Sequence, residues 1–241
     1  MKFITASNYE EMSELASETL LNCLIQKPDA LFCIATGGSP TLLYKLFVQK
    51  IKKQNLDTSH LKLLKLDEWF GLSLDNPASC EYYIQEHLIT PLNISPERYI
   101  SFNSLEKDSA VECQRITDLI ASNNGIDCCI LGLGKNGHLG LNEPAESINP
   151  FAHKAILTPK TKEHSMLTSN SETVSEGYTL GLKNILDSKK ILLLVTGEEK
   201  NEAFATLQKP LITSQNPANY LWLHDDTTCF VDNSSFLEAN N

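Results

Sequence analysis

Residues 30–40 read ALFCIATGGSP and carry the clearest indication of the fold class. The first part of this stretch, Ala30–Ala35, is a short apolar run that ends at a glycine turn, which is typical of a buried β-strand. Pro40 then opens a stretch to about residue 54 with helical character, because proline is favoured in the first turn of a helix. A buried strand, a glycine turn and a helix are therefore expected in direct succession.

The same alternation continues on both sides of this stretch. Further apolar runs predict strands at residues 61–66, 126–131 and 191–196, and a last short run predicts an edge strand at residues 229–231. Helical patterns are found at residues 9–26, 40–54, 81–88, 106–122 and 198–208. This alternation predicts an α/β fold with a three-layer, mainly parallel, Rossmann-like sheet and helices on both faces. Because repeats and long linkers are absent from the sequence, we expect a single domain over residues 1–241.

Composition argues against several classes of protein. The formal net charge is −10 and only two residues are arginine, so the chain lacks the basic stripe of a nucleic-acid-binding protein. No apolar run reaches the roughly 18 residues that a membrane-spanning helix requires. The N-terminus does not show the basic and then apolar segments of a signal peptide, so we expect a cytoplasmic location.

The seven cysteines include no C-x-x-C pair and lie mostly in apolar runs. They are therefore expected to be buried, reduced thiols. Neither they nor the six histidines have the spacing of a zinc site, so no metal is predicted.

Four polar segments each follow a predicted strand directly, at residues 36–40, 67–69, 132–143 and 196–200. The carboxyl ends of parallel strands meet at one edge of a sheet, and ligands bind there in open α/β folds. We therefore expect the four segments to form one site.

Residues 36–40 (TGGSP) have the features of a phosphate-binding turn. Glycine lets the backbone approach a ligand closely, and the free N–H groups and dipole at a helix start attract an anion. The segment lacks the Gly-Lys-Ser/Thr ending of a nucleotide loop, which favours a sugar phosphate; the alternative is a plain turn capped by Ser39. Lys200 is a second phosphate candidate, because a cation near a helix start is unfavourable unless an anion binds there. Its alternative role is a solvated surface lysine.

Asp67 and Glu68 follow the second predicted strand. Adjacent residues of an extended chain point to opposite sides, so one carboxylate should face the ligand and the other should face the protein. A carboxylate that points into a cleft suits general acid–base catalysis. The alternative is a pair of loop acids that cap a nearby turn.

Residues 132–144 read GLGKNGHLGLNEP and contain the spacing G-x-G-x-x-G. A dinucleotide site is not expected, because residues 138–144 do not open a long amphipathic helix and the loop does not follow the first strand. His138 and Glu143 lie five residues apart in this loop, and a histidine beside a carboxylate can transfer protons near neutral pH. The alternative is a structural histidine.

The segments TGGSP, LDEWFGL, GLGKNGHLGLNEP and TGEEK resemble, in this order, the motifs of the glucosamine-6-phosphate deaminase/isomerase superfamily. The resemblance covers about residues 30–210, and LDEW, GLGKNGHLGLNEP and LLLVTGE are the forms expected in its galactosamine-6-phosphate branch. It implies conversion of galactosamine 6-phosphate or glucosamine 6-phosphate to tagatose or fructose 6-phosphate, with release of ammonia and without metal or organic cofactor. Both monomers and homo-oligomers are compatible with this family.

The resemblance also implies roles for individual residues. Asp67 matches the carboxylate that moves a proton between C2 and C1 of the opened sugar, His138 matches the histidine that helps open the pyranose ring, and Glu143 matches its partner. Substrate- or phosphate-binding positions are matched by Thr36, Gly37, Gly38, Ser39, Gly137 and Lys200.

The chain departs from the glucosamine branch at two places. Asn136, a further catalytic candidate, stands where that branch typically has aspartate; a neutral amide can orient His138 but stabilises an imidazolium far less. A galacto sugar, with its inverted 4-hydroxyl, would explain this change. A phosphate-binding arginine is also missing around residues 161–167, where Lys162 or His164 could replace it.

Two other functions stay open on the sequence. A 6-phosphogluconolactonase shares the G-x-G-x-x-G-H loop but usually continues with S-x-F-P where this chain has Asn142-Glu143-Pro144, and the D-E-W-x-G-L form also argues against it. A module that senses sugar phosphate without turnover is compatible with Asn136, but it would not need the proton-transfer groups Asp67 and His138.

Overall fold

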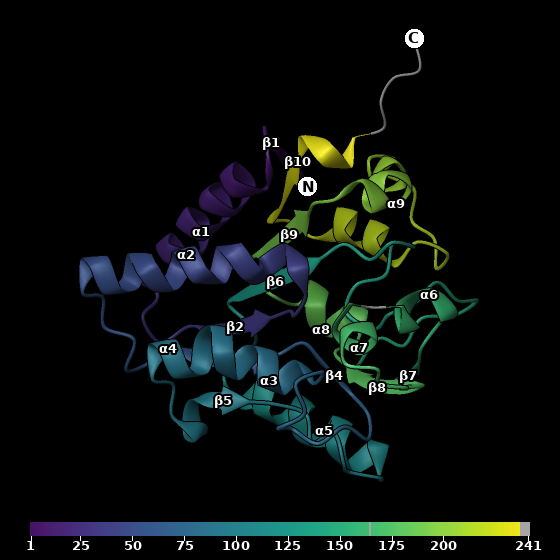
Figure 1. The fold of residues 1–241 in the computed structure, drawn as a ribbon, viewed down its shortest axis with the longest axis horizontal. Coiled ribbons are helices and arrows are strands. Elements are labelled where there is room, and N and C mark those ends of the chain that lie inside the picture. The colour runs from purple at the N-terminus through teal and green to yellow at the C-terminus, as the bar shows by residue number, and fades with distance from the viewer. Residues whose placement is uncertain (164, 237–241) are drawn as a thin grey trace.

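The computed structural model describes residues 1–163 and 165–236. Its centre is a seven-stranded sheet in the order β1-β10-β9-β6-β2-β3-β5 (Figure 1). All neighbouring strands of this sheet run parallel, which confirms the predicted, mainly parallel α/β fold. The strands are β1 (Lys2–Ala6), β2 (Leu31–Ile34), β3 (Lys62–Lys65), β5 (Tyr99–Ile100), β6 (Cys128–Gly132), β9 (Ile191–Val195) and β10 (Thr227–Asp232).

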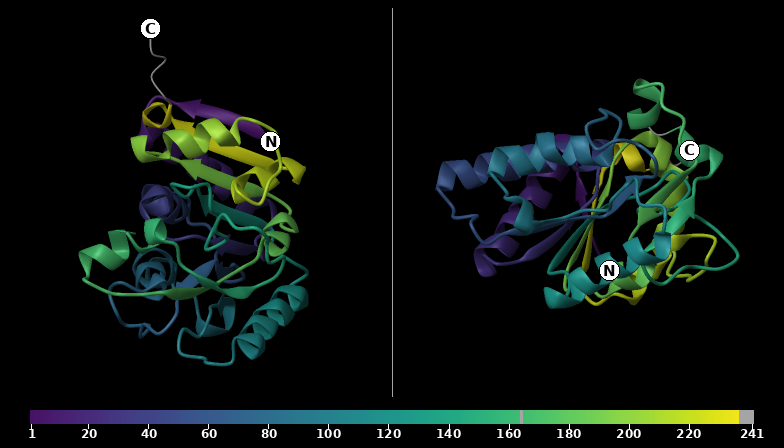
Figure 2. Two further views of the ribbon diagram at one scale, coloured as in Figure 1. Left: turned by 90° about the vertical axis from the view of Figure 1, so that its right-hand side faces the viewer. Right: turned by 90° about the horizontal axis from the view of Figure 1, so that it is seen from below.

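Each face of the sheet carries its own hydrophobic core. Side chains alternate along a strand, so Phe32 of β2 belongs to one core and the neighbouring Cys33 to the other. Helices therefore pack on both faces, as Figure 2 shows. One face is covered by α1 (Tyr9–Gln26) and α2 (Gly38–Gln54), and the other by α5 (Ser109–Ser122), α8 (Leu182–Leu186) and α9 (Asn201–Leu207).

The strand predicted at residues 229–231 is present as β10, but its predicted place at the edge of the sheet is wrong. β10 lies between β9 and β1 and is buried along its whole length. The edge is formed by β1, where Lys2 pairs with Thr228, and this strand was not predicted. Its five residues, KFITA, are mostly exposed or half-buried and carry no clear apolar run.

Some helices differ from their predicted ranges at the ends. α5 begins at Ser109 rather than at residue 106, because the Asp108 side chain accepts hydrogen bonds from backbone N–H groups of the first turn. The helix predicted at residues 81–88 is part of a longer helical run, and the helix predicted at residues 198–208 begins with a 3₁₀ turn. These pieces are α3 (Cys80–Ile84), the π-helical turn η1 (Gln85–Ile89), α4 (Thr90–Leu92) and the 3₁₀ turn η3 (Glu198–Lys200).

A small three-stranded antiparallel sheet, in the order β4-β8-β7, was not predicted. It holds the chain that leaves β3, because Asp67 pairs with Thr179. Its strands are β4 (Asp67–Trp69), β7 (His153–Ile156) and β8 (Glu176–Thr179), and α6 (Pro159–Lys162) and α7 (Ser165–Ser169) lie between β7 and β8 in the chain. The remaining 3₁₀ turns are η2 (Pro96–Arg98), η4 (Pro217–Leu223) and η5 (Asn233–Ser235).

All seven cysteines are free thiols. Five of them are buried and the other two are half-buried. Within residues 1–163 and 165–236, no helix is both long and apolar enough to cross a membrane.

Candidate active site

A cavity of about 390 Å³ opens at the carboxyl edge of the large sheet. Its walls come from all four polar segments, which lie far apart in the sequence and meet here as expected from the parallel strands. Most of the predicted site residues line it, namely Thr36, Gly37, Gly38, Ser39, Asp67, Asn136, His138 and Lys200. Glu143 and Gly137 are not part of the lining.

The start of α2 forms one wall of the cavity. α2 begins at Gly38, directly after Gly37, whose φ of 108° suits glycine. No side chain of the described residues caps this helix, so the alternative of a turn capped by Ser39 is wrong. The N–H groups of the first helical turn have no partner within the helix and attract an anion.

Three lysines line the same cavity: Lys200, Lys135 and Lys160. Burial lowers the pKa of Lys200, and the charges of Lys135 and Lys160 lower it further, against the opposing effect of Glu199. A bound anion would favour the charged form of Lys200. This group of lysines and the helix start place positive charge and free N–H groups along the walls of one cavity.

Sequence reasoning missed two of these lysines. Lys135 lies inside the GLGKNGHLGLNEP loop, whose strand-end position could have drawn attention to it. Lys160 lies in α6, far from any predicted strand end, and gave no local signal. Lys162, which was predicted as a substitute for the missing arginine, is exposed and does not line the cavity. His164, the other predicted substitute, lies outside the described residues.

His138 is held by the side chain of Asn136. The Asn136 Oδ1 atom lies 2.8 Å from Nδ1 of His138, and the Asn136 amide nitrogen donates a hydrogen bond of 2.9 Å to Glu143 Oε2. A carboxylate only accepts, so the amide nitrogen must face Glu143 and the amide oxygen must face His138. In the neutral ring the proton is then on Nδ1, and the free lone pair is on Nε2.

Glu143 lies behind this pair rather than in the cavity wall. Its Oε1 accepts a hydrogen bond from the Thr161 hydroxyl, and its Oε2 is 3.5 Å from Nδ1 of His138. Burial raises the pKa of Glu143, but its interactions with His138, Thr161 and Asn136 outweigh burial and lower it to about 2. Glu143 is therefore ionised at neutral pH.

Asp67 faces the cavity while Glu68 points into the protein, the alternation expected for an extended chain. Within the part of the chain that the structure describes, Oδ1 of Asp67 is buried and has no hydrogen-bond partner. Burial raises the pKa of Asp67 to about 7; the charge of Glu68 adds to this effect and Lys65 opposes it. A carboxyl group with this pKa can both accept and return a proton near neutral pH.

Gly137 has a structural role in the loop. Its φ is 82°, and a Cβ atom at this position would lie 1.9 Å from Oδ1 of Asn216. Its carbonyl oxygen accepts a hydrogen bond of 2.8 Å from the N–H of Ala218. The glycine thus lets the loop pack against the chain that enters η4, and a contact of Gly137 with substrate stays a prediction.

A metal site is not apparent in the cavity. Over residues 1–163 and 165–236, no group of three or more His, Cys, Asp or Glu side chains is arranged to hold a metal ion.

The sequence of this chain is similar to those of known proteins. A family described as glucosamine-6-phosphate isomerases/6-phosphogluconolactonase matches residues 6–230. The protein named "Putative deaminase AgaI" of Escherichia coli K12 is 46% identical over 225 residues, which are 93% of this chain and 89% of that protein. The glucosamine-6-phosphate deaminase of Clostridium acetobutylicum is 36% identical over 237 residues, which cover 98% of each chain.

Solved structures agree with this assignment of the fold. A monomeric glucosamine-6-phosphate deaminase of the NagB superfamily has a TM-score of 0.91 and 32% identity, with 98% of both chains covered. The 6-phosphogluconolactonase of Leishmania guyanensis has a TM-score of 0.79 and 17% identity, with 100% of this chain and 99% of that chain covered, and shows a shared fold alone.

Proposed function

The chain belongs to the glucosamine-6-phosphate isomerase/6-phosphogluconolactonase family, and from this premise we propose that it is an amino-sugar-phosphate deaminase. The proposed reaction converts galactosamine 6-phosphate, or glucosamine 6-phosphate, and water to the ketose 6-phosphate and ammonia. The observation that carries the proposal is the pairing, in one cavity, of an oriented histidine with a carboxyl group whose pKa is about 7.

The phosphate group binds at the start of α2. The N–H groups of its first turn and the ammonium of Lys200 contact the phosphate, with Lys135 and Lys160 supplying further positive charge in place of the arginine that this chain lacks. The anion also relieves the mutual repulsion of the three lysines. A phosphate fixed at this end holds the sugar at the proton-transfer groups.

His138 opens the sugar ring. Its Nε2 atom takes the proton of the anomeric hydroxyl and returns a proton to the ring oxygen, so that the C1–O5 bond breaks and a C1 aldehyde forms. Asn136 fixes the tautomer that leaves Nε2 free, and the ionised Glu143 fixes the amide of Asn136.

Asp67 then moves a proton from C2 to C1. The carboxylate removes the C2 proton while a proton of the C2 ammonium moves to the C1 oxygen, which gives an enol-type intermediate. The carboxyl group then delivers its proton to C1. The resulting C2 iminium adds water and breaks its C–N bond, which releases ammonia and leaves the C2 ketone. A pKa of about 7 suits a group that must act in both directions.

The galacto sugar is the preferred substrate in this proposal. Asn136 supports it, because an uncharged partner of His138 departs from the aspartate that is typical of the glucosamine branch.

The test compares purified protein on galactosamine 6-phosphate, glucosamine 6-phosphate and 6-phosphogluconolactone, without added metal. The proposal expects ammonia from the amino sugars, faster from the galacto sugar, and no acceleration of lactone hydrolysis. Faster release from the gluco sugar would keep the mechanism and overturn the substrate preference. Lactone hydrolysis without ammonia would establish the lactonase instead. Tight binding of both amino sugars without turnover would establish a sensing module.

A further inference from the structure

A buried ion cluster lies behind Asp67, on the side away from the cavity. We call Lys65, Glu68 and Glu81 the Lys65 cluster. The Lys65 ammonium lies 2.6 Å from Glu68 Oε2 and 2.7 Å from Glu81 Oε2. The side chains of Lys65 and Glu68 are completely buried, and Glu81 is almost so. None of the three lines the cavity.

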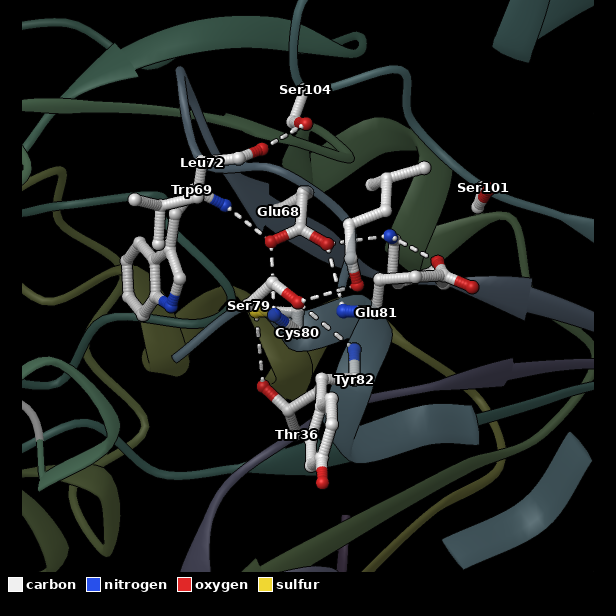
Figure 3. A network of polar contacts seen from close by, with 12 residues as sticks. Thr36, Glu68, Trp69, Leu72, Ser79, Cys80, Glu81, Tyr82, Ser101 and Ser104 are labelled. Carbon is white, nitrogen blue, oxygen red and sulfur yellow. Dashed lines mark hydrogen bonds and ion pairs between the residues drawn. The ribbon is translucent and has the colours of Figure 1, made fainter. Parts of the chain in front are cut away.

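Every acceptor position of Glu68 is occupied by a donor. Besides Lys65, its carboxylate accepts the N–H groups of Trp69 at 2.9 Å, Cys80 at 2.9 Å and Glu81 at 2.8 Å (Figure 3). A group that receives four donors must be the ionised carboxylate, because a protonated carboxyl would have to donate. Glu68 thereby ties β4, which carries Asp67, to the start of α3.

Glu81 is also surrounded by donors. Its Oε2 accepts from the Tyr99 hydroxyl at 2.9 Å as well as from Lys65, and its Oε1 accepts from the Gln85 amide at 2.9 Å. The Lys65 cluster therefore holds two carboxylates and one ammonium, a net charge of −1. Burying an unbalanced charge is costly, and the backbone donors at the start of α3 offset only part of that cost. An ion pair that served stability alone would need only one carboxylate for the one ammonium.

The negative charge of the cluster acts on Asp67 through Glu68, the next residue of β4. The charged neighbours of Asp67 on the protein side are Glu68 and Lys65. Two thiols also interact with Asp67, Cys33 of β2 and Cys80 of α3, and burial raises the pKa of both so far that they carry no charge. On the cavity side, the titratable residues in the same lining are Lys135, His138, Lys160, Glu163, Glu199 and Lys200.

We propose, resting on the function proposed above, that the Lys65 cluster positions Asp67 for proton transfer. It fixes the end of β4 against α3, and its net negative charge adds to the effect of burial in raising the pH range in which Asp67 can exchange a proton with the sugar. An aspartate with its usual acidity would be a weak base toward a C–H bond, and the charge behind it counters this weakness.

The first test measures the ionisation of Asp67 directly. In protein labelled with ¹³C at aspartate side chains, the Asp67 carboxyl signal is identified by its loss in Asp67→Asn and followed from pH 4 to pH 9. Glu68→Gln removes one negative charge, so the midpoint should fall by roughly 1 pH unit. Glu81→Gln also makes the cluster neutral, but Glu81 is further from Asp67 than Glu68 is. The midpoint of the Asp67 titration should therefore fall by about 0.5 unit or more in this variant.

Glu81→Gln guards against a folding failure of Glu68→Gln, which places an amide NH₂ group against backbone donors. The matched control is Glu112→Gln: Glu112 is similarly buried and pairs with Arg115, but both residues lie on α5, outside the Lys65 cluster. This control should lose stability and leave the midpoint unchanged. An unchanged midpoint in the folded Glu81→Gln protein overturns the proposal, because a purely structural cluster would affect stability alone.

The second test follows the acid limb of kcat/KM for ammonia release, which should move to lower pH in Glu81→Gln. The titration needs no turnover, so the two proposals fail in different ways. A wild-type chain that releases no ammonia overturns the proposed function, whatever the titration shows. A chain that releases ammonia while the midpoint and the acid limb stay in place in Glu81→Gln overturns only the role of the cluster.

Discussion

The amide oxygen of Asn136 lies 2.8 Å from Nδ1 of His138, and the same amide donates to Glu143. Glu143 therefore interacts with the imidazole in two ways, through this neutral amide and directly at 3.5 Å from Nδ1. The amide holds the ring orientation and its tautomer as a carboxylate would, but it lacks the negative charge that stabilises an imidazolium. This arrangement keeps His138 available as a base at Nε2.

Asn136→Asp tests this consequence. A second carboxylate beside His138 would favour the imidazolium, so a higher pH would be needed to free Nε2. The acid limb of kcat/KM for ammonia release should rise by roughly 1 pH unit, with little change in the rate on the alkaline plateau. Because Asp67 must also be ionised, this limb reports both groups, and a limb that becomes neither higher in pH nor steeper would contradict the role of His138 as the base.

Lys160 and Lys162 offer a matched pair for the phosphate site. Both side chains are exposed, but Lys160 lines the cavity and Lys162, two residues further along, does not. Lys160→Ala should lower kcat/KM by roughly tenfold to a hundredfold, mostly through KM, and should weaken inhibition by inorganic phosphate. Lys162→Ala should behave as wild type. Equal effects of the two substitutions would contradict the assignment of Lys160 to the phosphate.

Substitutions at Gly137 and Gly125 distinguish the effect of steric crowding on stability from that of backbone conformation. Both have a positive φ, 82° and 85°, but a Cβ at Gly137 would overlap Asn216, whereas at Gly125 it would meet open space. Gly125→Ala should lower the free energy of unfolding by about 1 kcal/mol, the cost of the backbone conformation. Gly137→Ala should lower it by about 3 kcal/mol, because crowding adds to that cost. Urea denaturation measures both, and equal losses would contradict the tight packing seen at Gly137.

The raised pKa of Asp67 makes stability depend on pH. Between its usual pKa near 4 and its folded pKa of about 7, the folded state holds a proton that the unfolded state has lost, so the contribution of Asp67 falls as pH rises. Asp67→Asn removes this effect. It should match wild type at pH 4 and be more stable at pH 8, by up to about 4 kcal/mol. A stability difference that is the same at both pH values would contradict the raised pKa.

Local sequence patterns predict the large sheet well, because buried parallel strands are continuous apolar runs such as those of β6 and β9. They fail for β4, whose three residues are a strand only because they pair with β8, more than a hundred residues later. β1 is not predicted for a related reason: an edge strand is only partly buried, so its sequence needs no apolar run.

The residues of the candidate site also differ in how well the sequence predicts them. Residues at the ends of apolar runs, such as Asp67 and His138, are predictable because parallel strands bring their carboxyl ends together. Lys160 lies in α6, which follows β7 of the small sheet, and it lines the cavity only because of how this helix is placed. No local sequence pattern specifies that placement. The Lys65 cluster is equally hidden, since Lys65 lies in an apolar strand and Glu81 in a separate helix.

The most direct test of the proposed function measures ammonia and ketose 6-phosphate formed from galactosamine 6-phosphate by the wild-type protein and by Asp67→Asn. We predict equal amounts of the two products from the wild type, and a rate at least about a hundredfold lower from Asp67→Asn although it still binds the sugar phosphate. Absence of ammonia from the wild type, or release at the wild-type rate by Asp67→Asn, would contradict the account.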